Sequence, residues 1–333
     1  MRKRLTGTGH SGQSPFSTTP KIPYTHVAVD HSQEEFTMPH AARTARNQMA
    51  FEVLTPNQVE EILQAAYTIL EQVGCKVQHA EALKMLADHG AHVEDDAVRV
   101  PRHLVQACLA AAPKGIVIYD RNGEPALRLH GRNTYFGTST ASPNNMDART
   151  GEVHPTTLKD IARAARVADA LPNIDWVMPF GSAQDVPGEI AEVYEFDAVV
   201  RNTTKPIAFC GYSGKGVARV YEMAAAVVGG MDALAAKPFV VAYPEPITPL
   251  TYPHEVVERI FIAADRFQPQ IPTGTQQPGA TAPITLAGSL SQSAAESLMA
   301  VVLVQLRQKG APVFMACNFG GFNMDTGLMS MVP

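Results

Sequence analysis

The stretch Thr281-Ala-Pro-Ile-Thr-Leu-Ala-Gly-Ser-Leu-Ser-Gln-Ser-Ala-Ala-Glu296 leads from a polar loop into a long run of small and apolar residues. The run predicts a helix at about 289–308, and the apolar residues that follow predict a strand at 313–317. On its amino-terminal side the chain repeats the same unit, a short strand followed by a helix. This repeat decides the fold class.

Six strands and five complete crossovers are predicted from residue 133 onward. Each strand is short, apolar and bounded by Gly or Pro, as expected of parallel strands that are covered on both faces. The strands are expected at 134–138, 174–180, 206–210, 239–243, 270–274 and 313–317, and the helices at about 157–170, 188–202, 215–229, 253–267 and 289–308.

This alternation predicts an α/β fold with a parallel sheet, either a doubly wound open sheet or a barrel. A doubly wound dinucleotide-binding sheet carries Gly-x-Gly-x-x-Gly after its first strand, whereas the residues here are Ser139-Thr-Ala-Ser-Pro-Asn144. We therefore favour a (β/α)8 barrel of the TIM type, whose active site lies at the carboxyl ends of the strands.

A closed barrel of this type needs eight strands, and 313–317 is only the sixth. We expect the chain to be a fragment of a longer protein, truncated after six strands; the alternative is that the sheet stays open. Residues 1–50, rich in Ser, Thr, Pro and Gly, predict a flexible leader. Residues 51–130 predict an N-terminal, mainly helical support subdomain, and residues 131–333 the incomplete barrel.

The support subdomain is predicted to begin with a helix at Thr55-Pro-Asn-Gln58. Thr55 has the side chain of an N-cap, Pro56 suits the first helical position, and Gln58 can close a capping box. Further helices are expected near 79–89 and 102–112, with short strands around 98–100 and 116–119.

Composition excludes several classes of protein. The chain has 333 residues, is 45% hydrophobic and carries a formal net charge of -5, so neither general disorder nor binding to nucleic acid is indicated. The positive start Met1-Arg-Lys-Arg-Leu5 is followed by no apolar stretch, and no window has roughly 18 uninterrupted apolar residues. Cysteines form no Cys-x-x-Cys pair, so neither a disulfide framework nor a zinc site is indicated. We expect a cytoplasmic protein without a membrane partner, in which homo-oligomer formation remains open.

Short motifs along residues 55–333 occur together in one order. They resemble the trimethylamine methyltransferase family, which includes methyltransferases for quaternary amines such as glycine betaine. The motifs are Leu54-Thr55, Leu70-Glu-Gln-Val-Gly-Cys-Lys-Val77, Ala170-Leu-Pro-Asn-Ile-Asp-Trp176, Asn202-Thr-Thr-Lys-Pro206, Pro283-Ile-Thr-Leu-Ala-Gly288 with Ala295-Glu296, and Gly310-Ala-Pro-Val313. Two departures from the family pattern, at Ala294 and at Gln276-Gln277, lie at the mouth of the fifth strand and bear on the substrate.

The resemblance implies a methyltransferase that moves a methyl group from a tertiary or quaternary amine to the Co(I) of a separate corrinoid protein, without binding a corrinoid itself. A quaternary amine leaves as a neutral tertiary amine, so the protein needs only to position and desolvate it. For trimethylamine the family uses pyrrolysine, which places the key catalytic residue beyond Pro333. The alternative is a catalytically inactive fragment or a quaternary-amine-binding protein. A barrel lyase or aldolase would need a Schiff-base lysine, and Lys205 precedes its strand.

A quaternary ammonium has no N–H group, so aromatic faces and carboxylates must hold it. Among the aromatic residues at strand ends, Tyr243 and Tyr212 are the best candidates, because both lie at or just past a carboxyl end. The alternative is core packing, since alternate residues of each strand point outward under the helices. The full list of candidates is Tyr135, Phe136, Trp176, Phe180, Phe209, Tyr212, Tyr243 and Phe319.

Carboxylates at the same level are Asp185 and Glu245, and the predicted substrate set is completed by Gln277 and Glu296. Each carboxylate has a structural alternative. Asp185 can cap the helix after Pro187, and Glu245 can be a solvated loop residue. Glu296 is expected in the first turns of a helix that begins near residue 289. There the helix dipole stabilises a carboxylate, so its role can be purely structural.

The glycine-rich segment Gly211-Tyr-Ser-Gly-Lys-Gly216 follows the third strand and opens a helix, so it suits either an anion site or a tight turn. It lacks the spacing of a Walker motif. Cys210 and Cys317 are expected to be buried thiols. The histidines show no metal-ligand spacing, so no metal site is expected.

Overall fold

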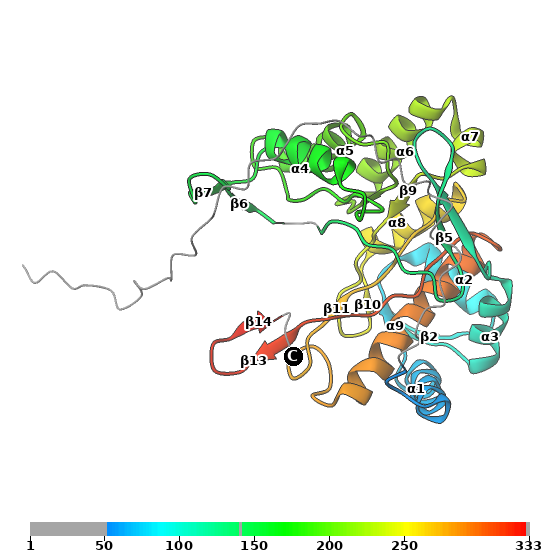
Figure 1. Cartoon of the computed structure of the whole chain (residues 1–333). Helices are drawn as coiled ribbons and strands as arrows, with labels where there is room; N and C mark the ends of the chain where they lie inside the picture. The colour runs from blue at the N-terminus through cyan, green and yellow to red at the C-terminus, as the bar shows by residue number, and fades with distance from the viewer. Residues whose placement is uncertain (1–51, 140–141, 331–333) are drawn as a thin grey trace, which may run out of the picture. The chain divides into compact units, whose positions relative to one another are not determined.

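The computed structural model describes residues 52–139 and 142–330 (Figure 1). Residues Val53–Pro333 cluster by their contacts into one compact unit, apart from Met1–Glu52. The predicted leader lies outside the described residues. The boundary near residue 130 stays a prediction.

The first helix confirms the capping pattern read from the sequence. α1 spans Pro56–Thr68, with Thr55 as N-cap and a complete capping box between Thr55 and Gln58. It continues into a single π-helical turn, η2 (Ile69–Val73), which ends at Gly74 with φ 82. A Cβ atom on Gly74 would lie 2.3 Å from the carbonyl oxygen of Val98, so only glycine fits at this position.

The front of the chain also forms a small sheet that was only partly predicted. Its strands are β1 (Cys75–Val77), β2 (His92–Glu94), β3 (Ala97–Arg99) and β10 (Thr251–Tyr252), in the order β10-β1-β3-β2. Because β10 comes from the later, repeating part of the chain, the two parts share one sheet. Two helices accompany it, α2 (Ala80–Asp88) and α3 (Arg102–Ala111).

All five predicted helices of the repeating part are present. A short helix that was not predicted, α7 (Met231–Ala236), follows α6. The predicted helices are α4 (Leu158–Ala170), α5 (Ala191–Val200) preceded by the turn η3 (Gly188–Ile190), α6 (Gly214–Val228), α8 (His254–Asp265) and α9 (Leu286–Arg307).

Three hairpins add to the repeat, and of their strands only the one at 116–119 was predicted. They are β4 (Ile116–Tyr119) with β5 (Pro125–Leu129), β6 (Asn144–Met146) with β7 (Val153–Pro155), and β13 (Gly321–Asn323) with β14 (Leu328–Ser330).

Each predicted strand segment pairs in parallel with the next one along the chain. The longest pairing joins β8 (Ile207–Phe209) to β9 (Val240–Ala242), and β11 (Thr275–Gln276) pairs with β12 (Asn318–Phe319). Single parallel bridges make the other links: Gly137 with Trp176, Val177 with Ile207, Ala242 with Gln270, and Gln270 with Val313. The fold is therefore mixed α/β, as predicted. Within 52–139 and 142–330 no pairing joins the first of these segments to the last.

The parallel segments present two different faces. On one face, Phe209, Val240 and their neighbours pack against helices α4, α5 and α6. On the other, Met178, Ala208 and Val241 pack against Ile116 and Leu127 of the β4–β5 hairpin. Residues one apart in a strand thus serve different layers. The hairpin fills the inner face of the sheet.

Helix α9 forms the centre of the second core, together with α8 and the front helices. Among the described residues it alone is long and apolar enough to cross a membrane by length and composition. However, 78% of its most apolar window is buried inside the protein. This burial is the behaviour of a core helix of a folded domain.

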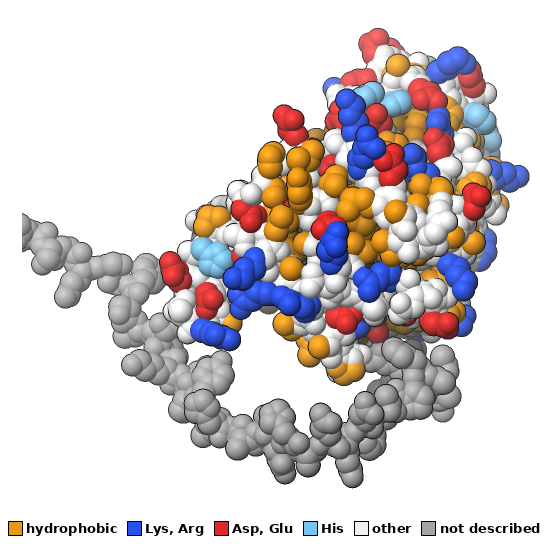
Figure 2. Space-filling model, turned by 90° about the horizontal axis from the view of Figure 1, so that it is seen from above, with side chains coloured by type: hydrophobic (Ala, Val, Ile, Leu, Met, Phe, Trp, Pro, Cys, Tyr) orange, Lys and Arg blue, Asp and Glu red, His pale blue; other side chains and the backbone are white. Residues whose placement is uncertain are grey.

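The surface over α4 and α5 keeps several apolar side chains exposed. Figure 2 looks down on the molecule from above the view of Figure 1 and shows hydrophobic side chains gathered across this face, with Lys and Arg side chains among and around them. The exposed residues here include Val167, Leu171, Ile190 and Tyr194. Homo-oligomer formation remains a prediction, and this face offers apolar area for it.

Candidate functional site

The loops that follow β8 and β9 bring together two of the predicted site residues. Tyr243 directly follows β9, and its N–H donates to the carbonyl of Phe209 at 2.9 Å. Its ring belongs to the inner face of the sheet, beside Cys210. Burial raises the pKa of Tyr243 to about 12, the charge of Glu245 adds to the rise, and a hydrogen bond with Asn318 opposes it. A neutral phenol therefore stands next to a carboxylate at the carboxyl end of the sheet.

Glu245 is an exposed residue. Partial burial of its carboxyl nevertheless raises the pKa of this group, and the charge of Arg259 opposes the rise. Arg259, on α8, donates to the carbonyl of Gly211 in the neighbouring loop and is half-buried. No ion pair within 4.0 Å to Glu245 exists among the described residues. The carboxylate is thus available to a cation from outside.

Tyr212 lies in the loop after β8, close to a pair of buried acids. The side chain is 41% exposed, and its hydroxyl lies 3.2 Å from the Ser182 hydroxyl and 3.3 Å from Glu195. Burial of the phenol raises its pKa to about 12. Tyr212 therefore presents a neutral ring whose hydroxyl is held by Ser182 and Glu195.

The acids below it, Glu192 and Glu195, are both only 2% exposed and come from the same side of α5. Glu195 accepts from the N–H of Ala183 at 2.8 Å, and burial, followed by the charge of Glu192, raises its pKa. Sequence analysis missed this pair. The available signal was two acids three residues apart in a mostly apolar helix, a spacing that puts both on one face.

Glu192 occupies the amino terminus of α6. One of its oxygens accepts from the backbone N–H and the hydroxyl of Ser213, at 3.3 and 3.2 Å, while Ser213 caps Gly216. Its other oxygen has no hydrogen-bond partner within the described residues. The anion favoured at this glycine-rich turn is thus one of the protein's own carboxylates.

Gly216 leaves room for that carboxylate, which gives a testable prediction. A Cβ on Gly216 would lie 1.5 Å from the nearer oxygen of Glu192. We expect Gly216→Ala to lower the free energy of unfolding by about 1–3 kcal/mol through overpacking. Gly188→Ala is the matched control, because a Cβ there would meet nothing within 4 Å. Urea unfolding followed by circular dichroism measures both, and equal midpoints would show that the turn tolerates a side chain.

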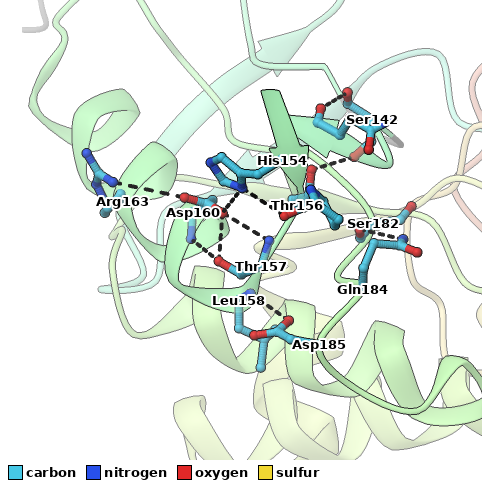
Figure 3. Close-up of polar contacts among 12 residues, drawn as sticks. Ser142, His154, Thr156, Thr157, Leu158, Asp160, Arg163, Ser182, Gln184 and Asp185 are labelled. Atoms are coloured by element: carbon cyan, nitrogen blue, oxygen red, sulfur yellow. Dashed lines mark hydrogen bonds and ion pairs between the residues drawn. The ribbon is translucent and has the colours of Figure 1, made fainter. Parts of the chain in front are cut away.

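The remaining predicted site residues have structural partners. Asp185 is exposed and accepts from the N–H of Leu158 at 3.0 Å, so it caps α4 rather than the helix after Pro187 (Figure 3). The backbone of Gln277 accepts three N–H groups of the following turn. Neither observation brings these two residues into contact with Tyr243.

Glu296 lies well inside α9, because the helix begins at Leu286 rather than near residue 289. It is 1% exposed, and its carboxylate accepts from the backbone of Leu250 and from the amides of Gln276 and Gln292, at 2.9, 2.6 and 3.0 Å. Burial raises its pKa in spite of these bonds. The expected dipole effect is lost at this depth, since it falls off within the first turn.

The other aromatic candidates separate by face. Phe209 packs edge-on against Phe196 and Tyr221 under the helices, as the core-packing alternative stated. The ring of Trp176 lies on the inner face across Gly137, where a Cβ would lie 2.1 Å from it. Cys317 is exposed, which corrects the expectation of a buried thiol, and Cys210 is half-buried.

A small pocket of about 210 Å³ lies beside the β6–β7 hairpin, between His154, Asp160 and Arg163 (Figure 3). The carboxylate of Asp160 accepts from both the hydroxyl and the backbone of Thr157, at 2.6 and 3.0 Å. Asp160 is therefore the acid of a capping box, and one of its carboxylate oxygens holds the start of α4.

Comparisons with known proteins agree with one another. A family model described as trimethylamine methyltransferase (MTTB) matches residues 27–331. Trimethylamine methyltransferase MttB of Desulfitobacterium hafniense (strain DSM 10664 / DCB-2) is 33% identical over 260 residues, 76% of this chain and 52% of that protein. Glycine betaine methyltransferase of Desulfitobacterium hafniense (strain Y51) is 28% identical over 285 residues, 84% of this chain and 59% of that protein. Trimethylamine methyltransferase MttB of Methanosarcina barkeri (strain Fusaro / DSM 804) is 27% identical over 297 residues, with coverage of 86% and 59%. The chain thus spans between half and three-fifths of the length of these curated relatives.

Proposed function

The chain belongs to the trimethylamine methyltransferase family, and on this basis we propose that the protein moves a methyl group from a methylated amine to the Co(I) of a separate corrinoid protein. The relatives that support this proposal include methyltransferases for a tertiary and for a quaternary amine. The observation that carries it at the level of the site is the pairing of Tyr243 with Glu245 at the end of β9.

The parallel segments are, in this proposal, part of a (β/α)8 barrel. Their order supports it, because every segment pairs with its neighbours in the chain. A doubly wound sheet would instead reverse its strand order at a switch point. In a barrel the loops after β8 and β9 lie at the catalytic mouth, which is where Tyr212, Tyr243 and Glu245 are found.

The proposed substrate is a small cation with methyl groups on nitrogen. The face of Tyr243 offers roughly 0.5–2 kcal/mol of cation–π attraction when the contact is desolvated. The carboxylate of Glu245 compensates the positive charge in a site of reduced water content. For a quaternary amine the electron pair of the broken C–N bond stays on nitrogen, so the leaving group is neutral and these residues need to supply no proton.

Binding of a quaternary amine tests this site. We expect Tyr243→Ala and Glu245→Gln each to raise the dissociation constant of glycine betaine or tetramethylammonium by roughly tenfold, which corresponds to about 1.4 kcal/mol. Tyr194→Ala and Glu189→Gln are matched controls on exposed positions outside the loops. Isothermal titration calorimetry measures the affinity. Unchanged affinity in both site variants would place the pocket elsewhere.

The pH dependence provides a second readout of the same site. Because burial raises the pKa of Glu245 above 4.5, its charge is present above that raised pKa and is lost as the pH falls through it. Cation affinity should therefore weaken on acidification in the unsubstituted protein. In Glu245→Gln this part of the dependence should be absent.

A further inference from the structure

The first turns of α8 carry three side chains that can reach one point. His254, Glu255 and Glu258 each offer one ligand atom, and these atoms all lie within 4.8 Å of one another. We propose that they bind a divalent transition-metal ion. The site is distinct from the amine site proposed above and does not depend on it. Sequence analysis expected no metal site, because the motif His-Glu-x-x-Glu falls outside the spacings it considered.

The distances between the three ligand atoms fit a small ion if the side chains move slightly closer together. Zinc bonds of about 2.0–2.2 Å leave tetrahedral ligand atoms roughly 3.4 Å apart. His254 and Glu258 are four residues apart, so they lie on one face of the helix, one turn above the other. Rotation about the side-chain bonds of glutamate supplies the remaining movement.

The charges also fit. No salt bridge within 4.0 Å involves Glu255 or Glu258 among the described residues. Two carboxylates and one neutral imidazole therefore carry a charge of -2, which a divalent ion balances. Arg259, the next residue along from Glu258, donates to the backbone carbonyls of Gly211 and Glu255.

Neighbouring residues hold two of the ligands in place. The ring of His79 stacks on His254 at 4.6 Å with an interplanar angle of 11°. The Nδ1 atom of His79 accepts from the N–H of Ala82, so His79 is a supporting ring.

Glu258 is confined from the other side by α6. A Cβ on Gly214 would lie 2.4 Å from one of its carboxylate oxygens, so the carboxylate packs against the backbone at the start of α6. Glu258 is half-buried, while His254 and Glu255 are exposed. An ion can therefore enter from solvent and meet one ligand that is already restrained.

The nature of the ligands selects the class of ion. Imidazole nitrogen suits Zn²⁺, Ni²⁺ and Co²⁺, whereas Mg²⁺ and Ca²⁺ prefer sites made of oxygen alone. Three protein ligands leave at least one position for water. Zn²⁺ is accordingly the probe of choice.

Calorimetric titration of ZnCl2 into tag-free protein, previously treated with EDTA, tests the site. We expect one equivalent of Zn²⁺ to bind, and His254→Ala and Glu258→Gln each to weaken this binding by at least roughly tenfold. His92→Ala is the matched control, because His92 is also exposed and lies 4.0 Å from a glutamate, Glu94. Its affinity should equal that of the unsubstituted protein. Equal binding by His254→Ala, or no binding by the unsubstituted protein, would overturn the proposal.

A second measurement follows the chemical modification of His254 in the unsubstituted protein, so it does not depend on the folding of a variant. Diethyl pyrocarbonate modifies accessible histidines, and peptide mass spectrometry reports which ones. We expect Zn²⁺ to protect His254 and to leave His92 as reactive as before. Modification of His254 at the same rate with and without Zn²⁺ would contradict the site, whatever the amine-binding experiments show.

Discussion

The protein is expected to demethylate a quaternary amine only when a reduced corrinoid protein is added. Without that partner the rate should fall to the background of the assay. The sequence has no Asp-x-His-x-x-Gly segment of the kind that holds a cobalamin. The inner face of the sheet is packed with side chains of the β4–β5 hairpin, among them Ile118 and Leu127. A macrocycle would therefore have to approach from outside, at the loops.

The measurement is the formation of the demethylated amine, followed by mass spectrometry, with and without the corrinoid protein. Equilibrium dialysis against free cobalamin is the control, and we expect no binding above background. Turnover with no corrinoid present would contradict the mechanism. Amine binding without turnover in the complete system would instead favour the alternative of an amine-binding protein.

Much of the repeating fold could be predicted because its signals are local. The helices α4, α6 and α8 have apolar residues at helical spacing, and Thr157 and Ser213 are recognisable caps. The pairing of each strand with the next one along the chain also agrees with the general rule that consecutive elements are usually neighbours in space. These features are set by residues near one another in the chain.

The parts that sequence analysis missed depend on distant residues. β10 is only two residues long and becomes a strand because it pairs with β1, far away in the chain. The β4–β5 hairpin fills the inner face only because Met178 and Val241 meet there. No local pattern reports such a pairing, since its stabilisation comes from tertiary contacts.

The site shows the same division. The position of Tyr243 and Glu245 just after one strand end was predictable, because the strand itself was; their role in binding stays a prediction. The pair Glu192 and Glu195 was missed because acids on helices are usually exposed. Their spacing puts both on one face, and the packing of α5 under the Tyr212 loop shows that this face is buried.

Glu296 shows how a residue chosen for chemistry can instead hold the core. Its carboxylate joins the turn at Leu250 to Gln276 at the end of the sheet and to Gln292 of its own helix. Tyr252 in addition donates to its backbone carbonyl. The cluster therefore connects α9, β10 and β11 in the buried interior.

Glu296→Ala is expected to be the most destabilising substitution considered. It leaves an N–H group and two amides without their acceptor. Because each buried donor left unsatisfied costs about 1–3 kcal/mol, the total loss is on the order of 3–5 kcal/mol. For a domain of this size that corresponds to a fall in melting temperature on the order of 10 °C. Glu222→Ala is the control, since its pair with Arg219 is exposed and contributes less than about 1 kcal/mol. Thermal melts followed by circular dichroism compare the two, and similar melting temperatures would show that the cluster carries little stability.

Glu296→Gln separates the hydrogen bonds from the charge. Its amide oxygen can still accept from Leu250, and the Gln276 oxygen, which has no partner among the described residues, can accept from the new amide after a flip of the Gln276 side chain. Burial raises the pKa of Glu296 above 4.5, so its contribution to stability is fully present below the unfolded pKa and is lost as the pH rises through the folded pKa. The unsubstituted protein should thus lose stability over that range relative to Glu296→Gln. Urea unfolding at a series of pH values measures this difference, and parallel pH profiles for the two proteins would show that Glu296 titrates as it does in the unfolded chain.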